Sequence, residues 1–361
     1  MNKIVAFHLY NDFSGSPKAL RTVLEGLLND GYSVDLYTSK GGVLDCLSQY
    51  EGCRIIHCRY RYTSNKIMTM FRFLVAQITI FFHSLKYLSE KECDFYINTI
   101  MPVGAAFAGR MMGKRVVYHY HENAHIKGGM YSILCRYMEK LADKIMCVSA
   151  YQSSFLKRSE GVYVVPNALE SSFIQQLKPD VEKAFEARTV LMLSSLKAYK
   201  GLVEFFKLAR LNKDLSFVAV INDISENIEE FIHINDIDVP DNMTYYSRQS
   251  NVAQFYNAAS LSLNLSRKSE FVETFGLTAL EAMSCALPVI VPTVGGIAEM
   301  VEDGVNGYKI DVENLNEISC AITRIFKDKE LYCSLAANSL AKSREFSLCR
   351  TVTQIESVLN G

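Results

Sequence analysis

Residues 273–281 read Glu273-Thr-Phe-Gly-Leu-Thr-Ala-Leu-Glu281, and this stretch decides which fold the chain is predicted to have. The apolar run 261–265 before it predicts a strand, and the residues after Gly276 predict a helix. The start of a helix presents unpaired backbone N–H groups and a partial positive charge, so it favours anions. Gly276 has no Cβ, which would let a phosphate come close.

The two glutamates do not form a close carboxylate pair. Eight residues of regular helix span ~12 Å, so a phosphate at the helix start would lie between them. A sugar would then lie near Glu273 and a ribose near Glu281, because a carboxylate can accept hydrogen bonds from both hydroxyls of a diol. From these residues alone, a capping Glu273 and an ordinary helical Glu281 are an equally good interpretation.

Strands and helices alternate outward from this stretch. In the first half, the strand at 3–9 is followed by a turn at 14–17, a helix with one apolar face and a strand at 33–38. Parallel strands need such a helical crossover, so the sequence predicts parallel sheets.

The length of 361 residues favours two domains. We predict an N-terminal Rossmann-like domain at 1–168, a charged linker at 169–188 and a C-terminal Rossmann-like domain at 189–343. The final residues, 344–361, are predicted to form a helix that packs back on the N-terminal domain.

The residues around the two glutamates resemble glycosyltransferase family 4. The run Glu273–Glu281 is followed by Leu-Pro-Val-Ile-Val-Pro, Gly-Gly-Ile-Ala-Glu and Glu-Asp-Gly-Val-Asn-Gly-Tyr, in that order, within about 50 residues. The resemblance implies a retaining enzyme with the GT-B fold, in which two Rossmann-like domains have parallel sheets facing across a central cleft.

The resemblance also implies roles for residues of the C-terminal domain. Glu273 would contact the transferred sugar as a catalytic residue, and Glu281 would hold the nucleotide ribose. The groups that would meet the donor phosphate are the side chain of Lys200 and the backbone of Phe275, Gly276 and Leu277.

One cation of the family pattern is missing. The segment ending in Lys200 resembles the family's Arg-Leu-x-x-x-Lys-Gly, but Ser195 stands at the arginine position. Lys197, Arg248 or Arg267 are candidates to replace it, although each could be an ordinary surface charge. Thr274 is a further candidate donor contact.

On the acceptor side, His121 follows the predicted strand 115–120, and strand carboxyl ends face the ligand crevice of open parallel sheets. His121 matches the family's catalytic histidine. His119 points to the same side of the sheet and is the reserve candidate. Gly15 and Ser16 match the first loop of the family, which approaches the donor phosphate, with one glycine where two are usual.

Composition narrows the partners. The formal net charge is −1 and the pI is near 6.7, so we expect no nucleic-acid partner. The ten cysteines are scattered, which favours reduced thiols in the cytoplasm. Asp236-Ile-Asp238 has the form of a metal motif but lies in a polar loop. We expect no metal and no cofactor beyond the nucleotide sugar.

The segment 67–88 is long and apolar, with scattered polar residues. It is predicted to be a helix buried on most sides, a peripheral membrane-contact helix or a membrane span. Basic residues lie in and before it, so residues 54–88 are the candidate contact with anionic lipid or an anionic acceptor.

The predicted function is transfer of a sugar from a UDP- or GDP-sugar to a hydroxyl of a glycan or lipid-linked acceptor. The expected setting is bacterial capsule, O-antigen or lipopolysaccharide synthesis, in the cytoplasm or peripherally on the inner face of the membrane. A catalytically silent sugar-nucleotide-binding or partner subunit is the alternative, favoured by Ser195. A sugar-nucleotide epimerase is a third, which the context of the two glutamates disfavours.

Overall fold

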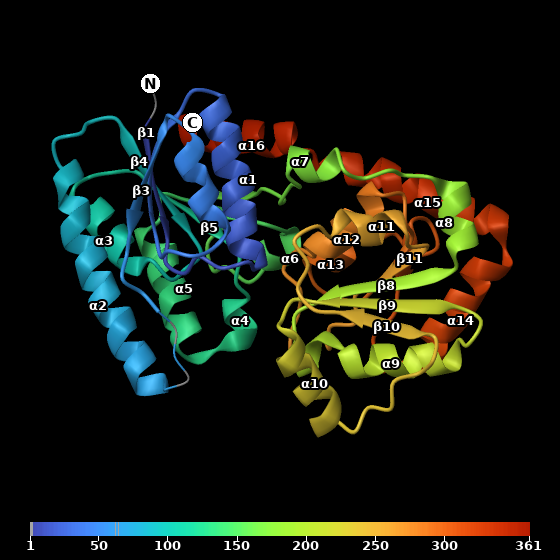
Figure 1. Cartoon of the computed structure of the whole chain (residues 1–361). Coiled ribbons are helices and arrows are strands. Elements are labelled where there is room, and N and C mark those ends of the chain that lie inside the picture. The colour runs from blue at the N-terminus through green and yellow to red at the C-terminus, as the bar shows by residue number, and fades with distance from the viewer. Residues whose placement is uncertain (1–2, 62, 64) are drawn as a thin grey trace. The chain divides into compact units, whose positions relative to one another are not determined.

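The computed structural model describes residues 3–61, 63 and 65–361. The chain divides into two compact units, each built on its own parallel sheet (Figure 1). Unit 1 contains the residues up to 168 together with 348–361, and unit 2 contains residues 169–347.

The sheet of unit 1 has seven strands in the order β3-β2-β1-β4-β5-β6-β7, and every strand pair is parallel. Its strands are β1 (Lys3–His8), β2 (Ser33–Thr38), β3 (Cys53–His57), β4 (Cys93–Asn98), β5 (Val116–Tyr120), β6 (Lys144–Cys147) and β7 (Val162–Val164). Its helices are α1 (Gly15–Asn29), η1 (Val43–Gln49), α2 (Lys66–Ser84), η2 (Leu85–Tyr87), α3 (Val103–Met111), α4 (Ala124–Lys127), α5 (Gly129–Leu141), α6 (Ala150–Ser153) and α16 (Leu348–Asn360).

Both faces of this sheet are covered, as the alternation of strands and helices predicts (Figure 1). One core contains Phe73 of α2 and Met138 of α5. The core on the other face contains Leu24 of α1 and Ile355 of α16. A fully covered sheet holds its strands rigidly, so side chains at the strand ends have fixed positions.

The sheet of unit 2 has six strands in the order β10-β9-β8-β11-β12-β13, again all parallel. Its strands are β8 (Thr189–Ser194), β9 (Ser216–Ile221), β10 (Met243–Tyr246), β11 (Leu261–Leu263), β12 (Val289–Val291) and β13 (Gly307–Lys309). Its helices are α7 (Ser171–Ile174), α8 (Val181–Ala187), η3 (Ala198–Lys200), α9 (Leu202–Leu211), α10 (Ser225–Ile234), α11 (Ala253–Asn257), α12 (Leu277–Ser284), α13 (Gly296–Glu299), α14 (Leu315–Lys327), α15 (Lys329–Ser343) and η4 (Arg344–Phe346).

The strand order reverses once in each sheet, between β1 and β4 in unit 1 and between β8 and β11 in unit 2. In open parallel sheets, ligands bind outside the carboxyl ends of the strands at this reversal. The topology therefore points to the residues after β1 and β4, and to those after β8 and β11.

Two predicted boundaries are wrong. Residues 169–188 are not a linker but part of unit 2, where they form α7 and α8. The Asp180 carboxylate caps α8 by accepting from the Lys183 amide at 3.1 Å, so this charged segment forms a capped helix. Residues 344–347 also belong to unit 2, and the terminal helix begins only at Leu348.

Helix α2 is not buried on most sides. It buries five residues along one face, namely Phe73, Ala76, Gln77, Ile80 and Ser84. The opposite face carries large apolar side chains that are exposed. The helix is therefore apolar on both faces but covered on only one.

Candidate functional site

In unit 2, Lys200 and Glu273 form an ion pair beside the strand reversal. Lys200 ends η3, and its Nζ donates to Oε1 of Glu273 at 2.5 Å. The same oxygen accepts from the Ser266 hydroxyl at 2.9 Å and from Asn264 Nδ2 at 3.3 Å. Burial raises the pKa of Glu273, but Lys200 and these hydrogen bonds outweigh it and hold the pKa below its ordinary value. Glu273 is therefore an ionised carboxylate at neutral pH.

Two aromatic rings hold the Lys200 ammonium from another side. It lies 4.1 Å from the centre of the Phe271 ring. The Tyr199 ring stacks on Phe271, with ring centres 4.9 Å apart. A cation over an aromatic face is attracted to it, so the ammonium is fixed by both a carboxylate and a ring.

Gly276 is required for a reason that differs from the predicted one. It caps the N-terminus of α12 with a φ of +100°, a conformation that favours glycine. A Cβ at this position would lie 2.5 Å from Cγ1 of Ile297 in α13. Glycine thus allows α12 to start close to α13, whether or not a phosphate approaches. The first N–H groups of α12 have no acceptors within the helix.

Phe275 and Leu277 flank this glycine. The Phe275 side chain is buried, and its ring centre lies 5.7 Å from that of Phe346. It anchors the loop, so only its backbone is suited to a ligand. Leu277 is the first residue of α12 and is half-buried.

Gly201 follows Lys200 and begins α9 in a left-handed conformation, with a φ of +77°. A Cβ here would lie 2.2 Å from the carbonyl oxygen of Leu265. The Lys-Gly pair therefore lets the start of α9 touch the chain that leaves β11. This contact brings Lys200 within reach of Glu273, which is 73 residues further along the chain.

Glu281, inside α12, is held by a residue that the sequence did not single out. The Tyr256 hydroxyl, on α11, donates to Oε2 of Glu281 at 2.6 Å. Burial, and then the charge of Glu281, raise the pKa of Tyr256 well above its ordinary value. Tyr256 therefore stays protonated and acts as a fixed donor to the carboxylate.

The candidates for the missing cation separate into two groups. Arg267 is engaged, because it forms ion pairs with Glu204 at 2.6 Å and with Glu270 at 3.1 Å. Arg248 is exposed, and its Nε donates to Asn222 Oδ1 at 2.7 Å. Neither arginine is available without giving up these contacts.

The Lys197 side chain differs from these two arginines. It is exposed, and no carboxylate within the described part of the chain pairs with it. Its amide donates to the Ser195 carbonyl at 2.8 Å, so both residues lie in the turn that leads to Lys200. Thr274, half-buried, directly follows Glu273.

In unit 1, a chain of hydrogen bonds joins two histidines at the strand reversal. His121 Nε2 donates to Asn98 Oδ1 at 2.8 Å, and Asn98 Nδ2 donates to His8 Nδ1 at 2.9 Å. Asn98 Nδ2 also donates to the Ser16 carbonyl at 3.2 Å. Since an amide oxygen can only accept, the Asn98 orientation fixes Nε2 as the protonated nitrogen of His121.

His119, the reserve candidate, is fully buried, and its ring centre lies 4.2 Å from that of His121. Its Nδ1 lies 2.6 Å from the Tyr96 hydroxyl. Burial lowers the pKa of His119 to about 3. Burial, followed by the neighbouring His119 and His8, also holds the pKa of His121 well below its ordinary value. His121 is therefore neutral at pH 7, which suits a hydrogen-bonding role.

Gly15 and Ser16 are the first two residues of α1. The Ser14 hydroxyl before them donates to Asp12 Oδ1 at 2.5 Å rather than capping the helix. The Ser16 carbonyl is tied to Asn98, which connects this loop to the histidine chain. The sequence analysis did not identify His8 and Asn98 as site residues, although both are polar residues that end strands of the sheet, β1 and β4.

The Asp236–Asp238 segment lies between Lys200 and Glu273 in the sequence, in the loop after α10 of unit 2. Asp238 Oδ2 pairs with Arg210 Nη2 at 3.2 Å. Asp236 adopts a left-handed conformation, with a φ of +48°, in the turn after α10.

Family models match both units. A model described as "Glycosyltransferase Family 4" matches residues 13–173, and one described as "Glycosyl transferases group 1" matches residues 173–341. Together they extend from the first loop of unit 1 to α15 of unit 2. The chain belongs to glycosyltransferase family 4 and has the GT-B fold.

Solved structures share the fold along the whole chain. HepE from Anabaena, crystallised with UDP and glucose, is 19% identical, and the match covers 100% of both chains with a TM-score of 0.77. Sucrose-phosphate synthase from Thermosynechococcus elongatus is 18% identical, with coverage of 100% and 98% and a TM-score of 0.78. At these identities the likeness concerns the fold.

Curated relatives match over shorter segments. N-acetyl-alpha-D-glucosaminyl L-malate synthase of Bacillus anthracis is 31% identical over 126 residues, which are 35% of this chain and 32% of that protein. An uncharacterized glycosyltransferase of Methanocaldococcus jannaschii is 29% identical over 237 residues, or 63% of each protein. These matches therefore span less than two thirds of the relatives' length.

Proposed function

We propose that this protein is a retaining glycosyltransferase that moves a sugar from a nucleoside-diphosphate sugar to a hydroxyl group. UDP- and GDP-sugars are the favoured donors. The proposal rests on one observation above all. In unit 2, the Lys200–Glu273 ion pair lies beside the strand reversal and just before α12, the helix that carries Glu281.

Each of these groups suits one part of such a donor. The leaving diphosphate gains negative charge as the glycosidic bond breaks. Lys200 and the N-terminus of α12 would stabilise that charge, and preorganised groups of this kind contribute ~10²–10³ in rate each. The carboxylates Glu273 and Glu281 would accept hydrogen bonds from the sugar and the ribose hydroxyls. The proposal includes no metal and no further cofactor.

We propose Lys197 as the replacement for the family's arginine. Ser195 at the arginine position cannot supply a charge. Arg267 pairs with two glutamates and Arg248 donates to Asn222, whereas Lys197 has neither kind of side-chain contact among the described residues and lies three residues before Lys200. In the same proposal, His121 serves the acceptor side of the reaction as a neutral imidazole.

The acceptor that we propose is a glycan or a lipid-linked glycan of bacterial capsule, O-antigen or lipopolysaccharide synthesis. A small cavity of about 130 Å³ in unit 1 supports an acceptor with an apolar part. Its lining combines Tyr60, Met70, Phe73, Met101 and Met130 with the polar residues Thr63, Lys66 and Thr69. We propose that the protein acts on such acceptors in the cytoplasm, peripherally at the inner face of the membrane.

The test is a thermal-shift screen across UDP-, GDP-, ADP- and dTDP-sugars. We expect one nucleotide class to raise the melting temperature. Replacing Glu281 with Ala or Lys200 with Ala should weaken binding of that donor about 10–150-fold, because each substitution removes a charge-assisted hydrogen bond of ~1.5–3 kcal/mol. Exposed residues of the same kind, Glu229→Ala and Lys207→Ala, are the matched controls.

A response to none of the nucleotide sugars contradicts the proposal. So does normal sugar transfer by both site variants. Ser195 favours the alternative of a catalytically silent sugar-nucleotide-binding subunit. That alternative predicts donor binding without transfer or hydrolysis by the purified protein, whereas an epimerase would interconvert the donor without any acceptor.

A further inference from the structure

Helix α2 carries an uncovered apolar stripe on its outer side. Ile67, Phe71, Leu74, Val75, Ile78 and Phe82 recur at helical spacing, and all six are exposed. Ile67 is 83% exposed, Phe82 63% and Phe71 61%. From Ile67 to Phe82 the stripe extends over 16 residues, or ~22 Å of helix. None of its six positions is charged or polar.

The inner side of α2 is fastened to α3. The Gln77 side-chain carbonyl accepts from the Gly104 amide at 2.9 Å. A Cβ on Gly104 would lie 2.3 Å from the Gln77 carbonyl oxygen, so the two backbones touch. Phe73, Ala76 and Ile80 belong to the core on this face of the sheet.

By length and composition, residues 66–87 are the one candidate for a membrane span within the described part of the chain. A spanning helix would be surrounded by lipid or other spans, yet α2 is fixed along one side to its own unit. A helix that is apolar on both faces must bury both. The geometry of α2 therefore suits a helix that lies in the plane of a surface, with its outer stripe inserted.

The charges around α2 indicate that the surface into which the stripe inserts is negatively charged. Between residues 54 and 88 the chain contains six lysines and arginines and no aspartate or glutamate: Arg54, Arg59, Arg61, Lys66, Arg72 and Lys86. Arg54 pairs with Asp35, and Lys86 lies over the Tyr87 ring. Arg59, Arg61 and Lys66 are exposed, and no carboxylate among the described residues pairs with them.

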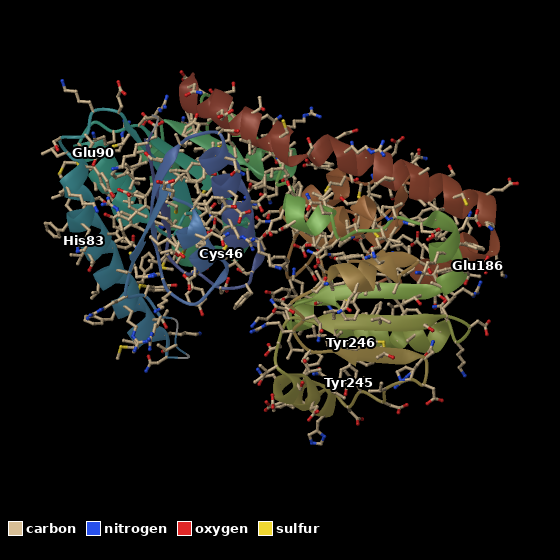
Figure 2. The ribbon with its side chains drawn as sticks, turned by 45° about the horizontal axis from the view of Figure 1, so that its top comes forward. Cys46, His83, Glu90, Glu186, Tyr245 and Tyr246 are labelled. Atoms are coloured by element: carbon tan, nitrogen blue, oxygen red, sulfur yellow. The ribbon has the colours of Figure 1, made fainter. Side chains whose placement is uncertain are left out.

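Figure 2 labels His83 and Glu90, two residues that follow the C-terminal end of the stripe. His83 lies on α2 next to Phe82, at the outer edge of unit 1. Glu90, the first carboxylate after the segment, already pairs with Lys3 at 2.8 Å. The stripe is thus bordered by unpaired positive charge near its N-terminal end and lacks negative charge along its length.

We propose that the outer stripe of α2 inserts into the headgroup region of an anionic lipid bilayer, with Arg59, Arg61 and Lys66 contacting lipid phosphates. Binding of this kind would bring unit 1 to the bilayer, where a lipid-linked acceptor would lie. The proposed function supplies only the biological reason for membrane binding, and the stripe and the charges support the binding itself. Apolar insertion and phosphate contact are the two signals that stable peripheral binding needs.

The experiment is co-sedimentation of the full chain with vesicles of phosphatidylglycerol and phosphatidylcholine, or of phosphatidylcholine alone, without donor or acceptor. We expect binding to the anionic vesicles. The triple substitution Phe71→Gln, Ile78→Gln and Phe82→Gln should lower the bound-to-free ratio at least about tenfold. Replacing Arg59, Arg61 and Lys66 with Gln should lower it by about one to two orders of magnitude, at low salt.

The matched control replaces three exposed apolar residues of unit 2 with Gln: Leu211, Ile224 and Ile234. It should bind vesicles as the unaltered chain does. Equal binding to neutral vesicles, or equal loss in the control, would overturn the proposal. A dimer that the stripe variant converts to a monomer, with no vesicle binding, would make the stripe an interface between two copies and also overturn it.

Nucleotide-sugar thermal shifts on the same variants separate this proposal from the proposed function. The stripe variant should keep the donor response, which also shows that it folds. Lost vesicle binding with an intact donor response concerns only the stripe. Vesicle binding in a chain that responds to none of the nucleotide sugars would contradict only the donor chemistry.

Discussion

The Lys200–Glu273 ion pair leads to a prediction about stability. The two side chains are only 17% and 15% exposed. The substitution Lys200→Met keeps an apolar stem but leaves Glu273 ionised without its cation. Removing one member of a buried pair costs ~3–5 kcal/mol, and the hydrogen bonds from Ser266 and Asn264 remain to support the carboxylate. We therefore expect a loss of about 3 kcal/mol in the free energy of unfolding at pH 7.

The loss should depend on pH in a defined direction. In the unaltered chain the pKa of Glu273 is lowered, so its ion pair stabilises the fold above the unfolded-state pKa and loses that effect as the pH falls through the folded-state value. In Lys200→Met, burial is left as the main influence and raises the pKa of Glu273. The carboxyl then becomes neutral at a higher pH, and the cost of a buried charge disappears. The difference between the two proteins should shrink as the pH falls towards the ordinary pKa of a glutamic acid.

The assay is urea denaturation followed by circular dichroism, since the chain has no tryptophan. The series is Lys200→Met, Glu273→Gln and the double variant, with the exposed Lys207→Met on α9 as control. If the two units unfold in separate transitions, the variants are compared by the transition that Lys200→Met shifts. We expect the double variant to recover about 2 kcal/mol relative to the sum of the single effects. The reasoning would be refuted if the changes in unfolding free energy of the two single variants add up to that of the double variant within ~0.5 kcal/mol. It would also be refuted if the loss in Lys200→Met were the same at every pH.

Two further predictions concern α12. Its C-terminus is closed by hydrogen bonds from the amides of Ala286 and Leu287 to the carbonyls of Met283 and Ala282, at 3.0 and 3.1 Å. Ala286 adopts a left-handed φ of +56° there, so Ala286→Gly should stabilise the protein by about 0.5–1 kcal/mol and raise its melting temperature; a fall would contradict this. Tyr256→Phe removes the donor to Glu281, so titration should show donor affinity lowered about fivefold with kcat little changed. Unaltered affinity would mean that Tyr256 does not position Glu281.

Local patterns were enough to predict much of the fold. Helical spacing and short apolar runs indicated two parallel α/β units, and the structure and the family models confirm that class. The segment 169–188 was misjudged because its helices are short and polar, so their apolar contacts give little periodicity. The outer face of α2 was not foreseeable, since an apolar residue looks the same in sequence whether its face is covered or not.

The candidate site shows the same limit. Motif positions identified Lys200 and Glu273 separately, but their ion pair depends on packing between segments that are 73 residues apart. The sequence makes Arg267 a candidate cation but does not show that it pairs with Glu204 and Glu270. His8 and Asn98 become neighbours only because β4 lies next to β1 in the sheet, an order that strand patterns do not reveal.

The return of α16 to unit 1 has a consequence for the order in which the protein can fold during synthesis. Val352 occupies the space beside Gly26 of α1, where a Cβ would lie 2.4 Å from it, and the carbonyl of Val358 accepts from Lys144. Unit 1 therefore combines residues that are made before unit 2 with residues that are made after it. Unit 2 is one continuous segment and can complete its fold first, whereas the core of unit 1 can be completed only after residues 348–361 have been made.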